Sequence, residues 1–344
     1  MKNSLLLLLC IMVPSQSDTI QTIERQDLQS FSTIARSSLM AQSKTEAWET
    51  VVPQVQSITI RSTADSTDQP ALFYNSGSPK MRPLLIALHS WSDNFQQQYS
   101  IPYGKWAVKN DWVFIHPDHR GPYTNPQATA SELAIQDIMD AINYAKNNAA
   151  VDTSRIYLIG FSGGGMTALI LAGRYPSSWT AVCAWVPVYD LVQWYRTTKN
   201  AAHGYAIHIK NSCGGAPLSG TDAYRECKRR SAGTYLANAK NRPVQVYIIS
   251  GIEDRFVPPG HALQAFNDLA DSSDFIQQKD IDYIDTHSTL PGHLRSHHNH
   301  HLFSKAGHQL LFSRQSNNAL IHIYSGDHDI IYNIGLLWLS RQKR

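Results

Sequence analysis

The sequence has little of several features that would define its class. It holds only four cysteines among 344 residues, which excludes a disulfide-dense mini-protein, and its 42% share of apolar residues excludes intrinsic disorder. Lysine and arginine (30) barely outnumber aspartate and glutamate (27), so the charge gives no argument for a nucleic-acid partner or an anionic membrane. The sequence also has no internal repeat and no long glycine–serine linker. The length suits one large α/β domain or two small ones.

Long hydrophobic runs are also missing, so we expect no transmembrane segment. The apolar run Leu5–Val13 is too short to span a bilayer. With a basic residue before it and the small residues Ser15–Ser17 after it, the run predicts a signal peptide over 1–17. Cys10 allows lipid anchoring as an alternative, but Leu9 is bulkier than the residue that precedes a lipidated cysteine. We therefore expect a secreted or periplasmic protein.

Export would place the three remaining cysteines in an oxidising compartment. Cys213 and Cys227 lie close together in a loop-rich stretch, so we predict that they form a disulfide. Cys183 lies within the apolar run Ala181–Val186, and we expect it to remain reduced inside a strand.

Strand-like and helical patterns alternate along the chain after a polar leader with a weak helix at 18–50. The predicted strands are a hairpin over 55–74, the buried runs Leu84–Leu88, Trp112–Ile115, Arg155–Ile159, Ala181–Val186 and Val244–Ile249, and two later strands, 309–313 and 320–324. Apolar residues recur at helical spacing over Ser131–Asn148, with Thr129 and Glu132 as a capping box, and Ile330–Leu339 predicts a final helix. The alternation predicts an α/β domain over 51–344, with a mostly parallel sheet covered by helices on both faces.

Two stretches interrupt this alternation. Residues 190–240 predict an insertion over one end of the sheet, and residues 271–308 form an irregular stretch. The second stretch contains His293, His297, His298, His300 and His301. These histidines lack helical spacing and cysteine partners, so we expect a solvated loop and no metal site. We also expect the basic groups Lys228–Arg230 and Arg341–Arg344 to lie on solvated faces.

The segment Gly160–Gly164 fits the nucleophile pattern G-x-S-x-G. It follows a strand and precedes the helical run Met166–Gly173, which is the context that this pattern requires. A nucleophile on so sharp a turn needs neighbours without side chains, because the backbone is strained and crowded. The helix N-terminus behind Ser162 offers free N–H groups to a developing oxyanion. We predict Ser162 as the nucleophile; the alternative is an ordinary glycine-rich turn.

A serine hydroxyl needs a base and an acid that orients the base, and in this pattern the acid precedes the histidine. Asp254 follows the strand Val244–Ile249, and His328 follows a later strand, so we predict these two residues in those roles. As alternatives, Glu253 is the acid while Asp254 caps a helix. His322 lies inside a strand, where we expect it to pack.

The expected oxyanion donors are the backbone N–H groups of Gly163 and Trp91. Trp91 lies in Leu88–Ser92, the loop that supplies the second donor in this pattern. Glycine is commoner than Ser90 after the histidine of such a loop, so the sequence departs from the pattern here. We expect His89 to hold the loop by hydrogen bonds and to take no part in proton transfer.

Four segments in this order resemble the α/β-hydrolase superfamily: Leu88–Ser92, Gly160–Gly164, Gly251–Pro258 and Gly326–His328. Within it, Ile115–Pro122 and Cys213–Gly215 resemble prolyl-oligopeptidase-like and acetyl-xylan-esterase-like single-domain hydrolases. The resemblance covers roughly 55–340. It implies the α/β-hydrolase fold, with an eight-stranded, mostly parallel sheet, the insertion at about 190–240 over the active site, and a serine mechanism that uses no cofactor.

We therefore predict a secreted serine hydrolase that cleaves carboxylic esters, including acyl groups on polysaccharides. The alternatives are a prolyl-oligopeptidase-like peptidase and an inactive module that binds glycans. We expect esters to be preferred, because the stretch before the first strand has no room for a propeller that screens peptides. One group of aromatic residues could either stack on substrate or pack the insertion onto the sheet: Trp91, Trp185, Tyr189, Trp194 and Tyr195.

Overall fold

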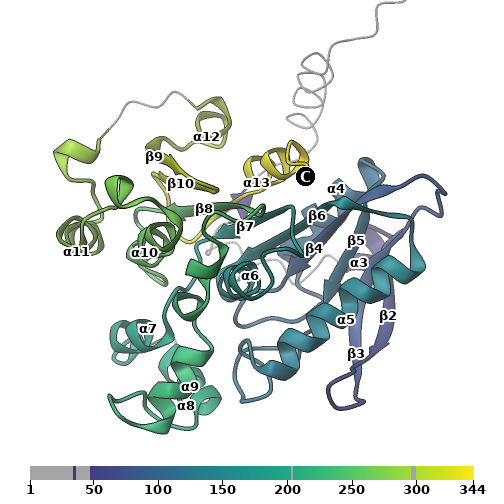
Figure 1. The fold of residues 1–344 in the computed structure, drawn as a ribbon, viewed down its shortest axis with the longest axis horizontal. Coiled ribbons are helices and arrows are strands. Elements are labelled where there is room, and N and C mark those ends of the chain that lie inside the picture. Colours follow the sequence, from purple (N-terminus) through teal and green to yellow (C-terminus); the bar gives the residue numbers. More distant parts are fainter. Residues whose placement is uncertain (1–33, 36–46, 203, 296–299) are drawn as a thin grey trace, which may run out of the picture. The chain divides into compact units, whose positions relative to one another are not determined.

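The computed structural model describes residues 34–35, 47–202, 204–295 and 300–344 (Figure 1). The predicted signal peptide, Cys10 and nearly all of the predicted leader lie outside these residues. The end of the leader forms the short helix α3 (Trp48–Val51). No helix in the described ranges is long and apolar enough to cross a membrane.

A sheet of nine strands forms the centre of the described chain, in the order β2-β3-β5-β4-β6-β7-β8-β10-β9. The strands are β2 (Gln56–Arg61), β3 (Asp68–Tyr74), β4 (Arg82–Leu88), β5 (Val113–Pro117), β6 (Val151–Phe161), β7 (Ala181–Trp185), β8 (Gln245–Gly251), β9 (Leu310–Ser316) and β10 (Ala319–Tyr324). All neighbours from β5 to β10 are parallel, whereas β2, β3 and β9 pair antiparallel. The mostly parallel α/β sheet is thus confirmed.

The sheet has one strand more than the resemblance implied. β9 returns beside β10 through a tight turn in which Asn317 adopts a left-handed conformation, with a φ of 51°. Burial alternates along much of β9, as expected for an edge strand with one face exposed to solvent. A separate two-residue pair joins β1 (Ile34–Ala35) to β11 (Ile330–Ile331). The predicted helix over 330–339 therefore begins later than expected, at Tyr332.

Helices cover both faces of the sheet (Figure 1). They are α4 (Ile101–Lys109), α5 (Glu132–Asn148), α6 (Gly163–Arg174), α10 (Gly260–Leu269) and α13 (Tyr332–Ser340). On one face, Leu158 and Val182 share a core with residues of α5, α6 and α10. On the other face, α13 packs so closely that a β-carbon on Gly335 would lie 3.0 Å from the Sγ of Cys183. The free thiol of Cys183 is thus buried between β7 and α13.

The start of α5 differs from the prediction. Ser131 is its N-cap, and the Ser131 hydroxyl accepts the Ala134 N–H at 3.1 Å. The Thr129 hydroxyl instead shares a hydrogen bond of 2.7 Å with Ser212 of the insertion. The predicted capping box of Thr129 and Glu132 is therefore wrong, because a tertiary contact occupies the threonine.

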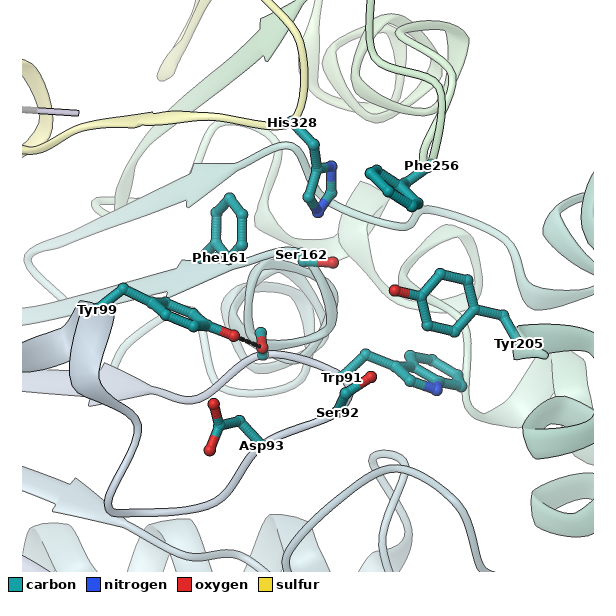
Figure 2. Close-up of a pocket in the computed structure, with 10 residues that line it drawn as sticks. Trp91, Ser92, Asp93, Tyr99, Phe161, Ser162, Tyr205, Phe256 and His328 are labelled. Carbon is teal, nitrogen blue, oxygen red and sulfur yellow. Dashed lines mark hydrogen bonds between the residues drawn. The ribbon is translucent and has the colours of Figure 1, made fainter. Parts of the chain in front are cut away.

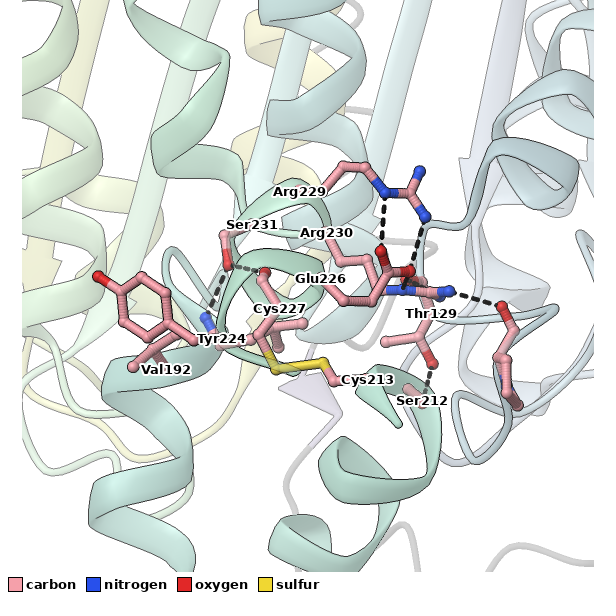
Figure 3. The surroundings of a disulfide bond; sticks show 12 residues. Thr129, Val192, Ser212, Cys213, Tyr224, Glu226, Cys227, Arg229, Arg230 and Ser231 are labelled. Carbon is pink, nitrogen blue, oxygen red and sulfur yellow. Dashed lines mark hydrogen bonds and ion pairs between the residues drawn. A yellow bond between two sulfur atoms is a disulfide. The ribbon is translucent and has the colours of Figure 1, made fainter. Parts of the chain in front are cut away.

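The insertion consists of short helices: α7 (Leu191–Thr198), α8 (Tyr205–Cys213), α9 (Asp222–Arg229), η2 (Ala232–Thr234) and η3 (Leu236–Ala239). A disulfide between Cys213 and Cys227 joins α8 to α9 (Figure 3). The prediction that Arg230 lies on a solvated face is wrong. Arg230 is buried, its guanidinium pairs with Glu226, and it donates to the carbonyls of Pro126, Ala128 and Thr129. Desolvation of the guanidinium is offset because charge-assisted hydrogen bonds satisfy it.

The second irregular stretch contains short helices between loops: η4 (Ser272–Asp274), α11 (Gln278–His287), η5 (Gly292–Leu294) and α12 (His301–Lys305). Outside this stretch, the 3₁₀ turn η1 (Gln98–Ser100) precedes α4. Of the histidine run, His297 and His298 lie outside the described residues. His293 pairs with Asp280 at 3.1 Å. Within the described ranges, no three His, Cys, Asp or Glu side chains are grouped to hold a metal ion.

Candidate active site

Ser162 lies on the sharp turn between β6 and α6. Its φ of 57° and ψ of −115° are strained for a residue with a side chain. A β-carbon on Gly160 would lie 2.2 Å from the carbonyl oxygen of Gly164, and one on Gly164 would lie 2.5 Å from the carbonyl oxygen of His89. Only glycine fits at these two positions, so the sequence around Ser162 is the one that a nucleophile elbow requires.

His328 follows β10 and meets the predicted acid. Its Nδ1 lies 2.7 Å from Oδ2 of Asp254, and both side chains are almost fully buried. The other Asp254 oxygen accepts the N–H groups of Phe256 and Val257, each at 2.9 Å. These bonds fix the carboxylate, which in turn orients the ring so that Nε2 is free to accept a proton. Glu253 is exposed to solvent, and within the described residues it forms no hydrogen bond or ion pair with His328.

The other candidate base, His322, is occupied elsewhere. It lies in β10, is buried, and its Nδ1 hydrogen-bonds the hydroxyl of Tyr247 on β8. The packing role expected for His322 agrees with this position.

The two predicted oxyanion donors lie side by side. Gly163 is the first residue of α6, where a backbone N–H has no acceptor within the helix. The Trp91 nitrogen lies 2.9 Å from the position that a β-carbon on Gly163 would occupy. Both N–H groups are therefore adjacent to Ser162, where the negative charge of a tetrahedral intermediate would develop.

A cavity of about 360 Å³ opens beside Ser162 (Figure 2). It is lined by Ser90, Trp91, Ser92, Asp93, Tyr99, Phe161, Ser162, Tyr205, Phe256 and His328. Five of these side chains are aromatic, and they come from both the sheet loops and the insertion. The insertion therefore contributes Tyr205 of α8 to the wall of the site.

The aromatic residues singled out in the sequence have different roles. Trp91 lines the cavity, whereas the ring of Trp194 lies behind Tyr205, with the two centroids 5.0 Å apart. Trp185 is fully buried in β7, and the Tyr189 hydroxyl donates to Asp268. Trp185 thus packs against α13, whereas Tyr189 and Trp194 pack within and beside the insertion.

Sequence reasoning missed four residues of the cavity wall. Phe256 lies within the segment Gly251–Pro258 that carries the acid, so its proximity to the site could have been inferred. Tyr99 and Tyr205 come from irregular or inserted segments that carry no motif, and Asp93 directly follows the segment Leu88–Ser92.

His89 supports the loop that carries Trp91. Its Nδ1 lies 2.9 Å from the Ser90 carbonyl and its Nε2 lies 2.6 Å from the Asp118 carbonyl. The His89 ring stacks on His119, with centroids 3.8 Å apart. Burial lowers the pKa of His89, so the ring is neutral at physiological pH, consistent with a structural role.

Sequence comparison relates the chain to esterases over part of its length. Feruloyl esterase B of Thermothelomyces thermophilus is 26% identical over 202 residues, which are 53% of this chain and 62% of that protein. Acetylxylan esterase A of Emericella nidulans is 26% identical over 115 residues, 30% of this chain and 37% of that protein. The chain thus matches less than two thirds of the length of either relative.

Structural comparison shows the α/β-hydrolase fold. The acylaminoacyl peptidase of Pyrococcus horikoshii has a TM-score of 0.51 at 14% identity, covering 68% of this chain and 37% of that one. Prolyl oligopeptidase B of Galerina marginata also has a TM-score of 0.51, at 16% identity, covering 62% of this chain and 31% of that one.

The chain also matches a family of serine hydrolases. The match runs from residue 127 to residue 323, and thus includes the elbow, the insertion and the acid. The matched segment is more than half of the chain, and the sheet and elbow described above have the arrangement that this fold requires. The chain belongs to the prolyl oligopeptidase family.

Proposed function

We propose that this protein is an exported serine esterase that removes acyl groups from hydroxyl-bearing substrates, including polysaccharides. The observation that carries the proposal is the meeting, at one cavity, of Ser162, the His328–Asp254 pair and the Trp91 and Gly163 N–H groups. Two relatives by sequence are named as esterases, which supports the ester as the bond that is cleaved.

The chemistry follows from this geometry. Ser162 Oγ attacks the acyl carbon while Nε2 of His328 takes the hydroxyl proton, and the oxyanion binds the Trp91 and Gly163 N–H groups. The C–O bond of the ester then breaks, and His328 returns the proton to the departing alkoxide. Water then attacks the acyl-enzyme as His328 takes its proton; the bond to Ser162 Oγ breaks, His328 returns the proton to Ser162, and the acid leaves. Asp254 keeps the ring oriented and stabilises the imidazolium that forms in each step.

The size of the cavity favours an acyl group over a peptide. At about 360 Å³ it lies near the lower end of small-molecule pockets, roughly 300–1,000 Å³, and five aromatic rings line it. Amide hydrolysis needs protonation of a poor leaving group, which demands a closely held peptide on both sides of the bond. A compact aromatic pocket can hold a small acyl group closely, but it has less room to hold a peptide on both sides of the bond.

One panel of substrates tests the proposal. We expect kcat/KM for p-nitrophenyl acetate, feruloylated and acetylated oligosaccharides to exceed that for Xaa-Pro and other peptide amides by at least about 100-fold. Ser162→Ala should lose this activity by roughly 10³-fold or more while retaining the fold, since the triad acts as a unit. A peptide amide preferred over every ester would contradict the assignment. Failure of a fluorophosphonate probe to label the wild type would favour the glycan-binding alternative.

Export is a separate part of the proposal. The sequence of the first 17 residues supports cleavage near Asp18. N-terminal sequencing of the protein recovered from the medium or periplasm should begin near that residue. Recovery only inside cells, with residue 1 intact, would contradict export.

A further inference from the structure

Asp93 is the one carboxylate among the residues that line the cavity. It lies two positions after Trp91, on the loop that follows β4, and it is half-buried. Its Oδ1 accepts the N–H of Asn94 at 3.0 Å. Within the described residues no salt bridge reaches Asp93, and Tyr99 is its hydrogen-bonding neighbour in the cavity wall. The Asp93 carboxylate is therefore placed to interact electrostatically with a molecule bound in the cavity.

The negative charge of Asp93 affects the neighbouring Tyr99 hydroxyl in the cavity wall. Burial raises the pKa of the Tyr99 hydroxyl above its ordinary value, and the charge of Asp93 raises it further. Tyr99 in turn shares a hydrogen bond of 2.5 Å with Ser90. Apart from His328, the remaining lining side chains are hydroxyls and aromatic rings, which carry no positive charge. The part of the cavity around Tyr99 therefore has a negative potential.

The position of Asp93 relative to the reacting groups defines which part of a substrate it contacts. In Figure 2, His328 and Asp93 lie on opposite sides of Ser162. The departing alkoxide must lie beside His328, because this ring returns the proton to it. An acyl chain that extends away from His328 would enter the part of the cavity that Tyr99 and Asp93 line.

We propose that Asp93 is a specificity-determining residue that selects the acyl group by charge. It favours acyl groups that carry a cation or a hydroxyl donor at their far end, and it disfavours those that end in a carboxylate. This inference rests on the proposed esterase function, but it concerns recognition at the acyl end only, since Asp93 takes no part in the transfer of protons.

Four matched esters test the inference. They are 4-methylumbelliferyl benzoates with a para-aminomethyl, hydroxymethyl, methyl or carboxyl group, which differ mainly in charge and in hydrogen-bond donors. For the wild type we expect kcat/KM to fall in this order. For Asp93→Asn the carboxyl ester should improve and the aminomethyl ester weaken by roughly 10-fold each, as expected for charges several ångströms apart at a half-exposed site. The methyl ester should change by less than about twofold.

Two controls isolate the effect of Asp93. Glu253→Gln removes the same charge from an exposed position outside the cavity wall and should leave the order and ratios of the four esters unchanged. Raising the ionic strength should reduce the charge discrimination of the wild type and have little effect on Asp93→Asn. The inference would be overturned if Asp93→Asn lowered kcat/KM equally for all four esters, or if the ratios of kcat/KM between the esters did not change.

Binding measurements separate this inference from the proposed function. Dissociation constants of the four esters for Ser162→Ala, with and without Asp93→Asn, report acyl recognition without hydrolysis. A charge-dependent order that Asp93→Asn abolishes would support the inference even if the wild type cleaved none of the esters. Binding that is absent, or independent of charge, would overturn it even if the wild type were an active esterase.

Discussion

Two groups of buried histidines differ in their partners. His328 contacts the carboxylate of Asp254 at 2.7 Å. In the second region, His89 stacks on His119, and His116 lies 6.5 Å from His89 between ring centroids. Neither ring nitrogen of His116 or His119 has a hydrogen-bond partner in the described part of the chain. The first region thus has a carboxylate partner, whereas two histidines of the second have no hydrogen-bond partner in the described chain.

Burial alone does not make a histidine a base. Burial lowers the pKa of His116 to about 3 and lowers the pKa of His119 well below its ordinary value, with like-charge repulsion from neighbouring histidines adding to both effects. A buried carboxylate has the opposite effect, because it stabilises the imidazolium. The partner, and not the depth of burial, determines which histidine can serve in catalysis.

The largest expected effect comes from removing the partner of His328. Asp254→Asn should lower kcat for an ester by about 10³–10⁴-fold, because the ring loses the acceptor that fixes its tautomer. Glu253→Gln is the matched control and should remain within about twofold of wild type. The measurement is steady-state hydrolysis of p-nitrophenyl acetate. The reverse result, with Glu253→Gln inactive and Asp254→Asn active, would assign the acid to Glu253.

The second prediction concerns stability against pH. The pKa of His116 in the folded state, about 3, lies below its unfolded value of about 6.5. The unfolded chain therefore binds more protons over this interval, so the stability is fully present above about pH 6.5 and is lost as the pH falls toward 3. Each such histidine contributes a slope of up to about 1.4 kcal/mol per pH unit. Urea unfolding between pH 7 and pH 4.5 measures it.

His116→Phe sharpens this test. His116 already packs edge-on against Trp48 and Phe114, so a phenyl ring suits the site. The variant should keep the wild-type stability at pH 7 to within about 1 kcal/mol, as for a similar-sized apolar replacement, and should lose stability less steeply below pH 6.5. An unchanged slope would show that His116 does not bind a proton on unfolding in this interval.

The smallest dependence on pH is expected in the insertion, away from both histidine regions. Replacing both Cys213 and Cys227 by alanine opens a loop with a sequence separation of 14 and should cost roughly 3 kcal/mol of unfolding free energy. The pair does not titrate, so the loss should be the same at every pH between 5 and 7. A loss that grew as the pH fell would couple the insertion to the histidine stack.

The sequence predicted the parts of the site that local backbone geometry dictates. Ser162 needs glycine neighbours wherever such a turn occurs, and Asp254 follows a strand end, so both leave a signal within a few residues. Tyr99 and Tyr205 reach the cavity through loop and helix packing, which depends on contacts between distant segments. The capping error at Thr129 and the solvated interpretation of Arg230 have the same origin: a long-range contact replaced the local preference.

Arg230 attaches the insertion to the rest of the domain through backbone carbonyls, so this attachment does not depend on particular side chains in the segment that it binds. Arg230 binds the carbonyls of Pro126, Ala128 and Thr129, and carbonyls are present whatever side chains those positions carry. Related chains could therefore exchange the residues of that loop, as well as the outward surface of the insertion, without losing the attachment. Arg230 thus attaches the end of α9, and the disulfide joins α9 to α8, which carries Tyr205; the outer side chains of this cover can change while the attachment stays.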